Sequence, residues 1–394
     1  GLMSSGTVSP SVLDWLTKLV AIDSTSRGSN LPVIDLIADH ARSLGLEPRL
    51  FPTDDGSKAN MIVSVPDASG SIDGGILLSG HTDCVPVDGQ NWASDPFTLT
   101  ERDGKVYGRG AADMKGFVAV IVDAMGAASR ATLARPIHFG FTYDEEVGCQ
   151  GAKPFMRSLA AAEIAPEVGF VGEPSSMRMI RAHKSINVIR VTVDGLASHS
   201  SLTSHGVNAI EYAAEVVRYW RERADRWRDE GPFDEGFPIP YTTGSVNRIE
   251  GGTAQNIVPA TCVVTLEFRA IAETDDQAEI EALRRFCAGV ERRMKAEHEE
   301  ASVAVDVLSS TIGLEMPEDS RVVELGEELG LAVSGDKVTY GTEAGVFSAS
   351  GIESVVCGPG DIAQAHKADE FVSVEQLGAC ERFVARLVAH VSTD

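Results

Sequence analysis

Residues 75–83 have the sequence Gly75-Ile76-Leu77-Leu78-Ser79-Gly80-His81-Thr82-Asp83. An apolar run bounded by glycines is typical of a buried strand, and here a histidine and an aspartate follow it directly. On both sides along the chain, similar apolar runs alternate with segments of helical period. That alternation predicts a mostly parallel sheet covered by helices, which is an α/β fold.

The α/β pattern occupies both ends of the chain. It predicts helices over residues 11–22, 31–44, 114–129, 321–329 and 374–390, and strands over residues 60–65, 75–79, 136–143, 167–171 and 354–357.

The middle of the chain has a different pattern. It predicts, in order, a strand, a helix, two strands, a helix and a strand, at residues 186–193, 207–228, 243–249, 262–269, 275–299 and 303–309. The order β-α-β-β-α-β is that of a ferredoxin-like α+β unit. We therefore expect one discontinuous α/β domain, residues 1–183 and 312–394, interrupted by an inserted domain at residues 184–311.

The composition restricts the partners of the chain. Its 394 residues include 58 acidic and 34 basic side chains, which gives a formal charge of −24. Binding to phosphate groups needs clustered positive charge, so this balance disfavours nucleic acid and an anionic membrane as partners. A cationic or zwitterionic small substrate is compatible with it, although an acidic surface also serves solubility alone.

The cysteines and the apolar runs bear on location. The six cysteines are scattered and form no Cys-x-x-Cys pair, which favours free thiols in a reducing compartment. No apolar run approaches the roughly 18–20 residues of a membrane span. Residues 1–6 carry no basic-then-apolar targeting pattern. We therefore expect a cytoplasmic protein.

Five short segments carry side chains that bind metal ions. These side chains are His81 and Asp83, Asp113, Glu145 and Glu146, Glu173, and His366. All but the Asp113 segment follow predicted strands, and ligands of open α/β sheets bind outside the carboxyl ends of the strands. Taken singly, each side chain has a plainer interpretation: a loop histidine, a helix N-cap at Asp113, or a solvated turn at the glutamate pair. Their joint placement at one sheet edge favours a site.

The residue types fit two zinc ions. Zinc binds histidine nitrogen and carboxylate oxygen, and two histidines with three carboxylates serve two ions if one carboxylate bridges them. Cobalt or manganese suits the same ligands. Asp83 lies two residues after His81 and can fix the orientation of its ring. Glu145, beside Glu146, is the expected general base for a bound water.

Five motifs together resemble the family of dinuclear-zinc deacylases and exopeptidases. They are HTDCVP at 81–86, GRGAADMKG at 108–116, DEEVGCQGAK at 144–153, GEPS at 172–175 and AHKADEF at 365–371. The resemblance covers residues from about 10 to 390, including the inserted domain.

The resemblance implies a role for each of these side chains. Asp113 would bridge the two ions, His81 and Glu173 would complete one site, and Glu146 and His366 the other. Glu145 would be the base and Asp83 a supporting residue. The resemblance also implies a cis peptide bond between Asp113 and Met114.

For the inserted domain, the resemblance implies a lid that also forms a homodimer. His199, in Gly195-Leu196-Ala197-Ser198-His199-Ser200-Ser201, would reach the scissile carbonyl from its own or the partner subunit. A helix-capping loop is the alternative, and both roles are compatible. Asn256 and Arg269 match positions associated with the substrate carboxylate, which arginine binds well through paired hydrogen bonds. For Arg269, an ordinary surface strand residue remains the alternative.

The segments at 199–213, 340–344 and 358–366 resemble the branch of the family that deacetylates N2-acetyl-L-ornithine. Glu343 is a candidate for recognising a cationic side chain, or alternatively for supporting a metal ligand by hydrogen bonding. A second hypothesis is a related deacylase or dipeptidase, such as succinyl-diaminopimelate desuccinylase. A third, a catalytically silent metal-binding protein, requires a missing ligand or base, and none is missing from the sequence.

Overall fold

The computed structural model describes residues 7–393, so the expectation about residues 1–6 lies outside the described residues. The chain divides into two compact units. The first takes in the residues up to 182, residues 314–335 and those from 342 onward, and the second consists of residues 183–313 and 336–341. The chain leaves the first unit within β8 (Ala182–His183) and re-enters it at β15 (Leu314–Glu315).

The first unit is built on a six-stranded sheet in the order β1-β2-β6-β3-β7-β16. The strands are β1 (Pro48–Pro52), β2 (Ala59–Val65), β3 (Ile76–His81), β6 (Ile137–Thr142), β7 (Val168–Val171) and β16 (Glu353–Val356). Strands β6, β3, β7 and β16 run parallel to one another. Strands β2 and β1 add an antiparallel edge. The predicted mostly parallel α/β fold is confirmed.

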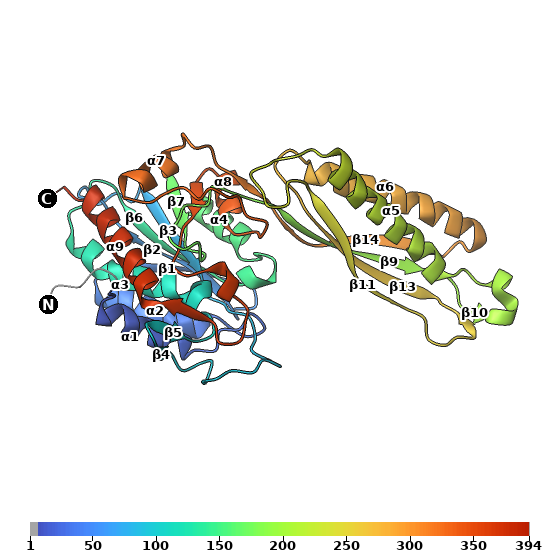
Figure 1. Cartoon of the computed structure of the whole chain (residues 1–394), viewed down its shortest axis with the longest axis horizontal. Coiled ribbons are helices and arrows are strands. Elements are labelled where there is room, and N and C mark those ends of the chain that lie inside the picture. Colours follow the sequence, from blue (N-terminus) through green and yellow to red (C-terminus); the bar gives the residue numbers. More distant parts are fainter. Residues whose placement is uncertain (1–6, 394) are drawn as a thin grey trace. The chain divides into compact units, whose positions relative to one another are not determined.

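Helices surround this sheet. They are α1 (Pro10–Val20), α2 (Leu31–Ser43), α3 (Gly116–Arg130), α4 (Ala152–Ala161), α7 (Arg321–Glu328), α8 (Ala344–Ala349) and α9 (Val374–Val391). Helices α1 and α9 both pack against α3 (Figure 1). Among these, α4 and α8 are absent from the sequence-based expectation.

The register of the sheet shows that both of its faces are covered. Gly80 on β3 faces Val118 of α3 at close range. Its neighbour Ser79 points to the opposite face, where it is paired with Gly140 of β6. Gly140 in turn faces Phe155 of α4. Helices α3 and α4 therefore lie on opposite faces, and the sheet core between them excludes water.

A small antiparallel sheet, in the order β17-β5-β4, was not predicted. Its strands β4 (Thr100–Arg102), β5 (Lys105–Tyr107) and β17 (Phe371–Ser373) are too short to show an alternating pattern. Pairing of β5 with β17 brings the loop at 108–113 beside the residues at 365–370, and the N–H of Gly108 donates to the carbonyl of Glu370 at 3.0 Å. Two of the metal-ligand segments are thus held next to each other.

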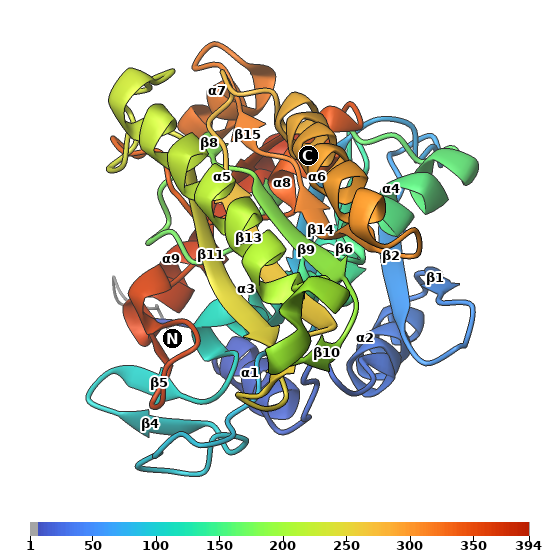
Figure 2. The same ribbon diagram turned by 90° about the vertical axis from the view of Figure 1, so that its right-hand side faces the viewer.

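The second unit has the predicted β-α-β-β-α-β order. Its elements are β9 (Ile186–Asp194), α5 (Ala209–Glu230), β11 (Thr243–Gly251), β13 (Thr261–Arg269), α6 (Asp276–Glu297) and β14 (Ser302–Thr311). The sheet order is β11-β13-β9-β14, and α5 and α6 lie across one face of it (Figure 2). Alternate residues of β9 and β13 are buried against these helices, around Trp220, Trp227 and Phe268.

Two further observations bear on the expectations from composition. Within residues 7–393 no disulfide joins any of the six cysteines, and five of them are buried. Within residues 7–393, each helix is too short or too polar to cross a lipid bilayer.

Candidate metal centre

The carboxyl ends of the four parallel strands β6, β3, β7 and β16 meet at one edge of the first unit. Three groups of side chains at this edge place one ligand atom each within 4.8 Å of one another: His81, Glu145 and Glu146; His81, Asp113 and Glu173; and Asp113, Glu146 and His366. All the predicted ligands are therefore gathered in one cluster, within a single unit.

His81 is the last residue of β3 and is completely buried. Its Nδ1 lies 2.9 Å from the main-chain oxygen of Asp83, which can only accept a hydrogen bond, so Nδ1 carries the hydrogen. Its Nε2 faces the cluster, 2.8 Å from Asp113 Oδ1 and 3.1 Å from Glu173 Oε1. Nε2 is therefore the atom that can lose its proton and bind a cation.

Asp113 lies between two imidazoles. Its Oδ1 is 2.8 Å from His81 Nε2, and its Oδ2 is 3.1 Å from His366 Nε2. The two carboxylate oxygens thus face different histidines, which is the arrangement needed for a bridging carboxylate. The peptide bond between Asp113 and Met114 is cis, as the resemblance implied.

His366 and Glu146 form the other side of the cluster. His366 Nε2 lies 2.8 Å from Glu146 Oε2, and the His366 side chain is 56% exposed, so this side opens to solvent. The backbone of His366 has a φ of 68°, in the left-handed region that residues other than glycine rarely adopt. The turn around His366 must therefore be held by other contacts.

Asp83 contacts the glutamate pair more directly than it contacts His81. Its Oδ1 accepts the backbone N–H of Glu145 and its Oδ2 that of Glu146, both at 3.1 Å. Its carboxylate lies 3.4 Å from His81 Nδ1, farther than its own main-chain oxygen. The expected contact between the Asp83 carboxylate and the His81 ring is thus secondary, because the N–H of His81 Nδ1 is directed at the main-chain oxygen of Asp83.

Glu145 has the position expected of a base. Its Oε2 lies 3.3 Å from His81 Nε2, and its Oε1 accepts a long hydrogen bond from the Cys149 thiol at 3.8 Å. Burial, together with the charge of Glu173, raises the pKa of Glu145 well above its usual range. A carboxylate with a raised pKa holds a proton more readily near neutral pH, as proton transfer requires.

The electrostatics of the cluster require positive charge. Burial, followed by the charge of Asp113, raises the pKa of Glu173 to about 8 and that of Glu146 well above its usual range. Burial opposes the charged form of Asp113 too, but hydrogen bonds with His366 and His81 hold the pKa of Asp113 well below its usual range. Several buried carboxylates share one small volume, and cations between them would relieve both burial and mutual repulsion.

Two unpartnered oxygens support the fit to metal ions. Within residues 7–393, Glu146 Oε1 and Glu173 Oε1 are buried and accept no hydrogen bond. Each belongs to a different group around Asp113. A buried acceptor without a donor is costly, so two oxygens of this kind suit two cations, one on each side of Asp113.

Glu343 lies in the first unit, and only 1% of its surface is exposed, so its side chain does not reach solvent. Its Oε1 accepts a hydrogen bond from Thr142 Oγ1 at 2.7 Å, and Thr142 is the last residue of β6, three residues before Glu145. Burial raises the pKa of Glu343 to about 7. This position favours the supporting role over direct contact with a substrate.

The other three predicted residues belong to the second unit. His199 pairs with Ile257 between the two short strands β10 (Ser198–His199) and β12 (Ile257–Val258), so the exposed Asn256 lies beside it. Arg269 ends β13, about 25 Å from the start of that strand at 3.3 Å per residue. The second unit thus brings His199 and Asn256 together, but it places Arg269 at the far end of β13.

Arg269 makes contacts of its own within the second unit. Its Nη1 donates to the carbonyl of Thr339 at 3.3 Å, and its Nε lies 3.4 Å from Glu267.

His199 caps the short helical turn that follows it, residues Ser200–His205. Its Nδ1 accepts the backbone N–H of Ser201 at 3.2 Å. A backbone N–H only donates, so the hydrogen of the neutral ring lies on Nε2. The capping interpretation is therefore correct for Nδ1, and it leaves Nε2–H available as a donor.

Sequence reasoning missed Arg109, Glu370 and Gln90. Arg109 and Glu370 are buried and form an ion pair at 2.9 Å, and Gln90 donates to the carbonyl of His366 at 2.8 Å. The first two lie inside the motifs at 108–116 and 365–371, so those motifs were the available signal. Their hydrogen bonds go largely to backbone groups, and a sequence does not show which backbone groups a side chain will contact.

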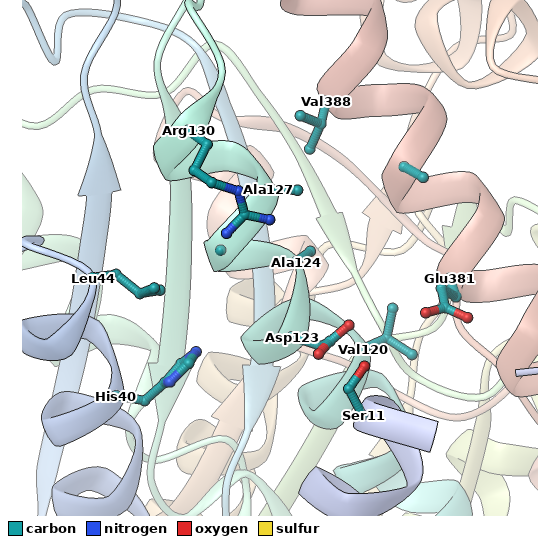
Figure 3. A pocket seen from close by; sticks show the side chains of 12 residues that line it. Ser11, His40, Leu44, Val120, Asp123, Ala124, Ala127, Arg130, Glu381 and Val388 are labelled. Carbon is teal, nitrogen blue, oxygen red and sulfur yellow. The ribbon is translucent and has the colours of Figure 1, made fainter. Parts of the chain in front are cut away.

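A hollow of about 440 Å³ lies elsewhere on the first unit, over the outer face of α3. Ser11, His40, Asp123, Arg130 and Glu381 lie around it (Figure 3). None of the clustered metal-ligand side chains lines it. The hollow is therefore separate from the candidate metal centre.

Known proteins resemble this chain in sequence and in fold. Residues 77–390 match a family model described as peptidase family M20/M25/M40. The chain is 36% identical over 372 residues to the acetylornithine deacetylase of Proteus mirabilis (strain HI4320), covering 93% of this chain and 92% of that protein.

Two solved structures share the fold. A tripeptidase from Staphylococcus aureus has a TM-score of 0.74 at 19% identity, covering 99% of this chain and 100% of that one. A dinuclear metal binding peptidase from Bacillus subtilis has a TM-score of 0.67 at 14% identity, covering 97% of each chain.

Proposed function

Because the chain belongs to peptidase family M20/M25/M40, we propose that it is a two-zinc amide hydrolase that converts N2-acetyl-L-ornithine and water into L-ornithine and acetate. The observation that carries the metal-dependent chemistry is Asp113, whose two oxygens face His81 and His366. The substrate is supported by the 36% identity to an acetylornithine deacetylase. We place the reaction in the cytoplasm and in arginine biosynthesis.

Five side chains would hold the ions. Asp113 would bridge them, His81 and Glu173 would hold one, and Glu146 and His366 the other, as the two groups around Asp113 suggest. When bound, the ions would polarise the acyl carbonyl and make a nearby water more acidic. Cobalt or manganese suits the same donor set.

Glu145 would move the proton. It takes a proton from water as the water oxygen bonds to the acyl carbon, and it gives that proton to the amine nitrogen as the carbon–nitrogen bond breaks. Asp83 supports this step because its carboxylate fixes the backbone of Glu145 and of Glu146. Glu343 supports the same strand end through Thr142.

His199 would stabilise the negative charge that develops on the carbonyl oxygen. The Ser201 N–H occupies its Nδ1, so a neutral His199 offers Nε2–H as a donor. Removing one donor aimed at such an oxygen typically costs about 3–4 kcal/mol of transition-state stabilisation.

Asn256 and Arg269 would bind the substrate carboxylate. His199 and Asn256 lie beyond the start of β13 and Arg269 at its end, about 25 Å away at 3.3 Å per residue. An acylated amino acid spans only about 10 Å, comparable with three extended residues. His199 and Arg269 can therefore serve one substrate only if they come from different subunits, which supports a homodimer formed through the second unit.

The exposed apolar side chains of the second unit are consistent with that dimer. Ile249 on edge strand β11 is 51% exposed, and Ile210 and Ile257 are 38% and 40% exposed. An open edge strand with apolar neighbours is a surface that another chain can cover.

A substrate panel tests the proposal. The purified chain with added zinc is assayed with N2-acetyl-L-ornithine, N-succinyl-L,L-diaminopimelate and simple dipeptides, and we expect the highest kcat/KM with acetylornithine. A preference for the succinylated substrate or a dipeptide would support the alternative, a related deacylase or dipeptidase. Two bound ions with no turnover of any substrate would indicate a catalytically silent metal-binding protein.

A further inference from the structure

A buried ion pair connects the two loops that carry Asp113 and His366. Arg109 Nη1 donates to Glu370 Oε1 at 2.9 Å, and the two side chains are 0% and 1% exposed. Arg109 lies four residues before Asp113, and Glu370 lies four residues after His366. The pair therefore joins the two segments on either side of one metal position.

Glu370 holds the Asp113 loop through its backbone. Besides Arg109, its Oε1 accepts the N–H of Gly110 at 3.0 Å, and its Oε2 accepts the N–H groups of Ala112 at 2.9 Å and of Asp113 at 3.0 Å. Four donors thus converge on the two oxygens of one side chain. Only an ionised carboxylate offers acceptors alone on both atoms.

Arg109 and Gln90 hold the His366 turn in the same way. Arg109 Nη1 also donates to the carbonyl of Lys367 at 3.0 Å, and its Nη2 donates to Gln90 Oε1. Gln90 Nε2 in turn donates to the carbonyl of His366 at 2.8 Å. Two successive carbonyls of the turn are therefore fixed by donors from other segments.

That turn needs holding, because its backbone is strained. His366 has a φ of 68° and Asp369 a φ of 57°, in the left-handed region that is unfavourable for residues other than glycine. The N–H of Ala93 donates to Asp369 Oδ1 at 2.9 Å, which adds a further contact to the turn. Without these contacts, the turn would relax and move the His366 ring away from Asp113 and Glu146.

We propose that Arg109, Glu370 and Gln90 are positioning residues that fix His366 relative to Asp113, and so set the affinity for the ion held by Asp113, Glu146 and His366. This proposal rests on the two-metal site of the proposed function. Mutating residues that hydrogen-bond to metal ligands without touching the metal commonly changes metal affinity 10- to 100-fold. A role confined to stability would weaken the fold without changing the affinity of one ion more than that of the other.

The test measures zinc content against free zinc in chelator-stripped protein. The reference is a free zinc concentration at which the unaltered chain holds two ions and the His366→Ala chain holds one. At this concentration we expect Glu370→Gln and Gln90→Leu to hold close to one ion, with affinity for the second ion lowered about 10- to 100-fold. Glu370→Gln keeps the shape but turns an NH2 group toward N–H donors.

A matched control uses another arginine–carboxylate pair near the same loop. Arg27 forms a bidentate pair with Asp88, at 2.6 and 2.9 Å, but the two side chains are 62% and 63% exposed. Arg27→Gln should therefore hold two ions. Thermal unfolding of the metal-free protein shows whether each variant is folded. If Glu370→Gln does not fold, Gln90→Leu alone tests the proposal, because Gln90 lies near the surface and its replacement disturbs the fold less.

Two ions in Gln90→Leu and Glu370→Gln, with unchanged affinities, would overturn the proposal. An equal loss of affinity for both ions would overturn it too, since Arg109, Glu370 and Gln90 would then act on the whole fold. Failure of the unaltered chain to bind two ions would instead contradict the proposed function.

Discussion

Asp83 accepts the backbone N–H of Glu145 at 3.1 Å, so the orientation of the proposed base depends on a residue that follows a different strand. Asp83 follows β3, whereas Glu145 follows β6, and the two strands are parallel neighbours. The other oxygen of the same carboxylate accepts the N–H of Glu146. One buried side chain therefore sets the base and a metal ligand together, while their own side chains remain free for different tasks.

Those different tasks can be separated by mutation. Glu145→Ala should lower kcat by about 10²- to 10⁴-fold, the usual contribution of a general acid–base group, and should leave zinc content unchanged. Glu146→Ala should lose zinc as well as activity, because Glu146 contacts His366 at 2.8 Å. Elemental analysis gives the zinc content of each variant, and steady-state kinetics gives its kcat. Loss of zinc from Glu145→Ala would show that Glu145 is a ligand.

His199→Ala should lower kcat by about 10²- to 10³-fold, the usual cost of removing one donor to the carbonyl oxygen. His205, an exposed histidine of the same turn, provides the control, and His205→Ala should keep full activity. Both variants should retain two ions. An unchanged rate in His199→Ala would leave the capping of residues 200–205 as its role.

Glu343→Gln should reduce kcat/KM equally for cationic and neutral acyl amino acids, because Glu343 is buried and contacts Thr142. A loss confined to cationic substrates would instead show that Glu343 recognises the substrate side chain.

Glu343 should also make stability depend on pH. Burial raises its folded pKa to about 7 from 4.5, so the folded chain binds more protons than the unfolded chain between these pH values. The stability that the protonated Glu343 contributes is therefore fully present below pH 4.5 and is lost as the pH rises through 7. The free energy of unfolding should fall over this range by roughly 3 kcal/mol at most. Glu343→Gln should remove this part of the dependence, since glutamine resembles the protonated form. Equal melting-temperature shifts at pH 5 and pH 8 would contradict the assignment.

Removal of metal should abolish turnover and leave the chain folded. Of the five ligands, only His81 at the end of β3 belongs to the sheet, whose core is filled by apolar side chains such as Leu77, Phe139 and Phe170. A ligand present at 1,000 times its dissociation constant stabilises the folded state by about 4 kcal/mol, so a chelator should lower the melting temperature by several degrees. Far-UV circular dichroism before and after chelation measures whether the chain stays folded and how far its melting temperature falls. Activity assays after chelation and after zinc is restored measure the loss and recovery of turnover.

The sequence was sufficient to predict every strand of the six-stranded sheet except β1, and to predict the cluster at its edge. The reason is geometric: His81, Glu145 and Glu173 each lie at or just after the end of a parallel strand, and such ends share one edge. Long apolar runs also predicted β3 and β6 to within about two residues. Where side-chain type and strand position together determine the structure, a single sequence carries the information.

The remainder depended on contacts that a sequence does not display. Glu370 is the clearest case, because its partners are mainly backbone N–H groups, and these are the same for every residue type except proline. Arg109, in a glycine-rich loop, has the sequence context of a solvated cation but is completely buried. The small sheet of β4, β5 and β17 consists of strands of three residues each, too short for any period to be recognised.

The interruption of the first unit affects the order in which the newly made chain can mature on the ribosome. Strand β7 ends at Val171, but its partner β16 begins only at Glu353, and the inserted unit is synthesised between them. The inserted segment can reach its native topology while the first sheet still lacks an edge strand. His366 emerges later still, so the nascent polypeptide can load its full complement of ions only near the end of translation.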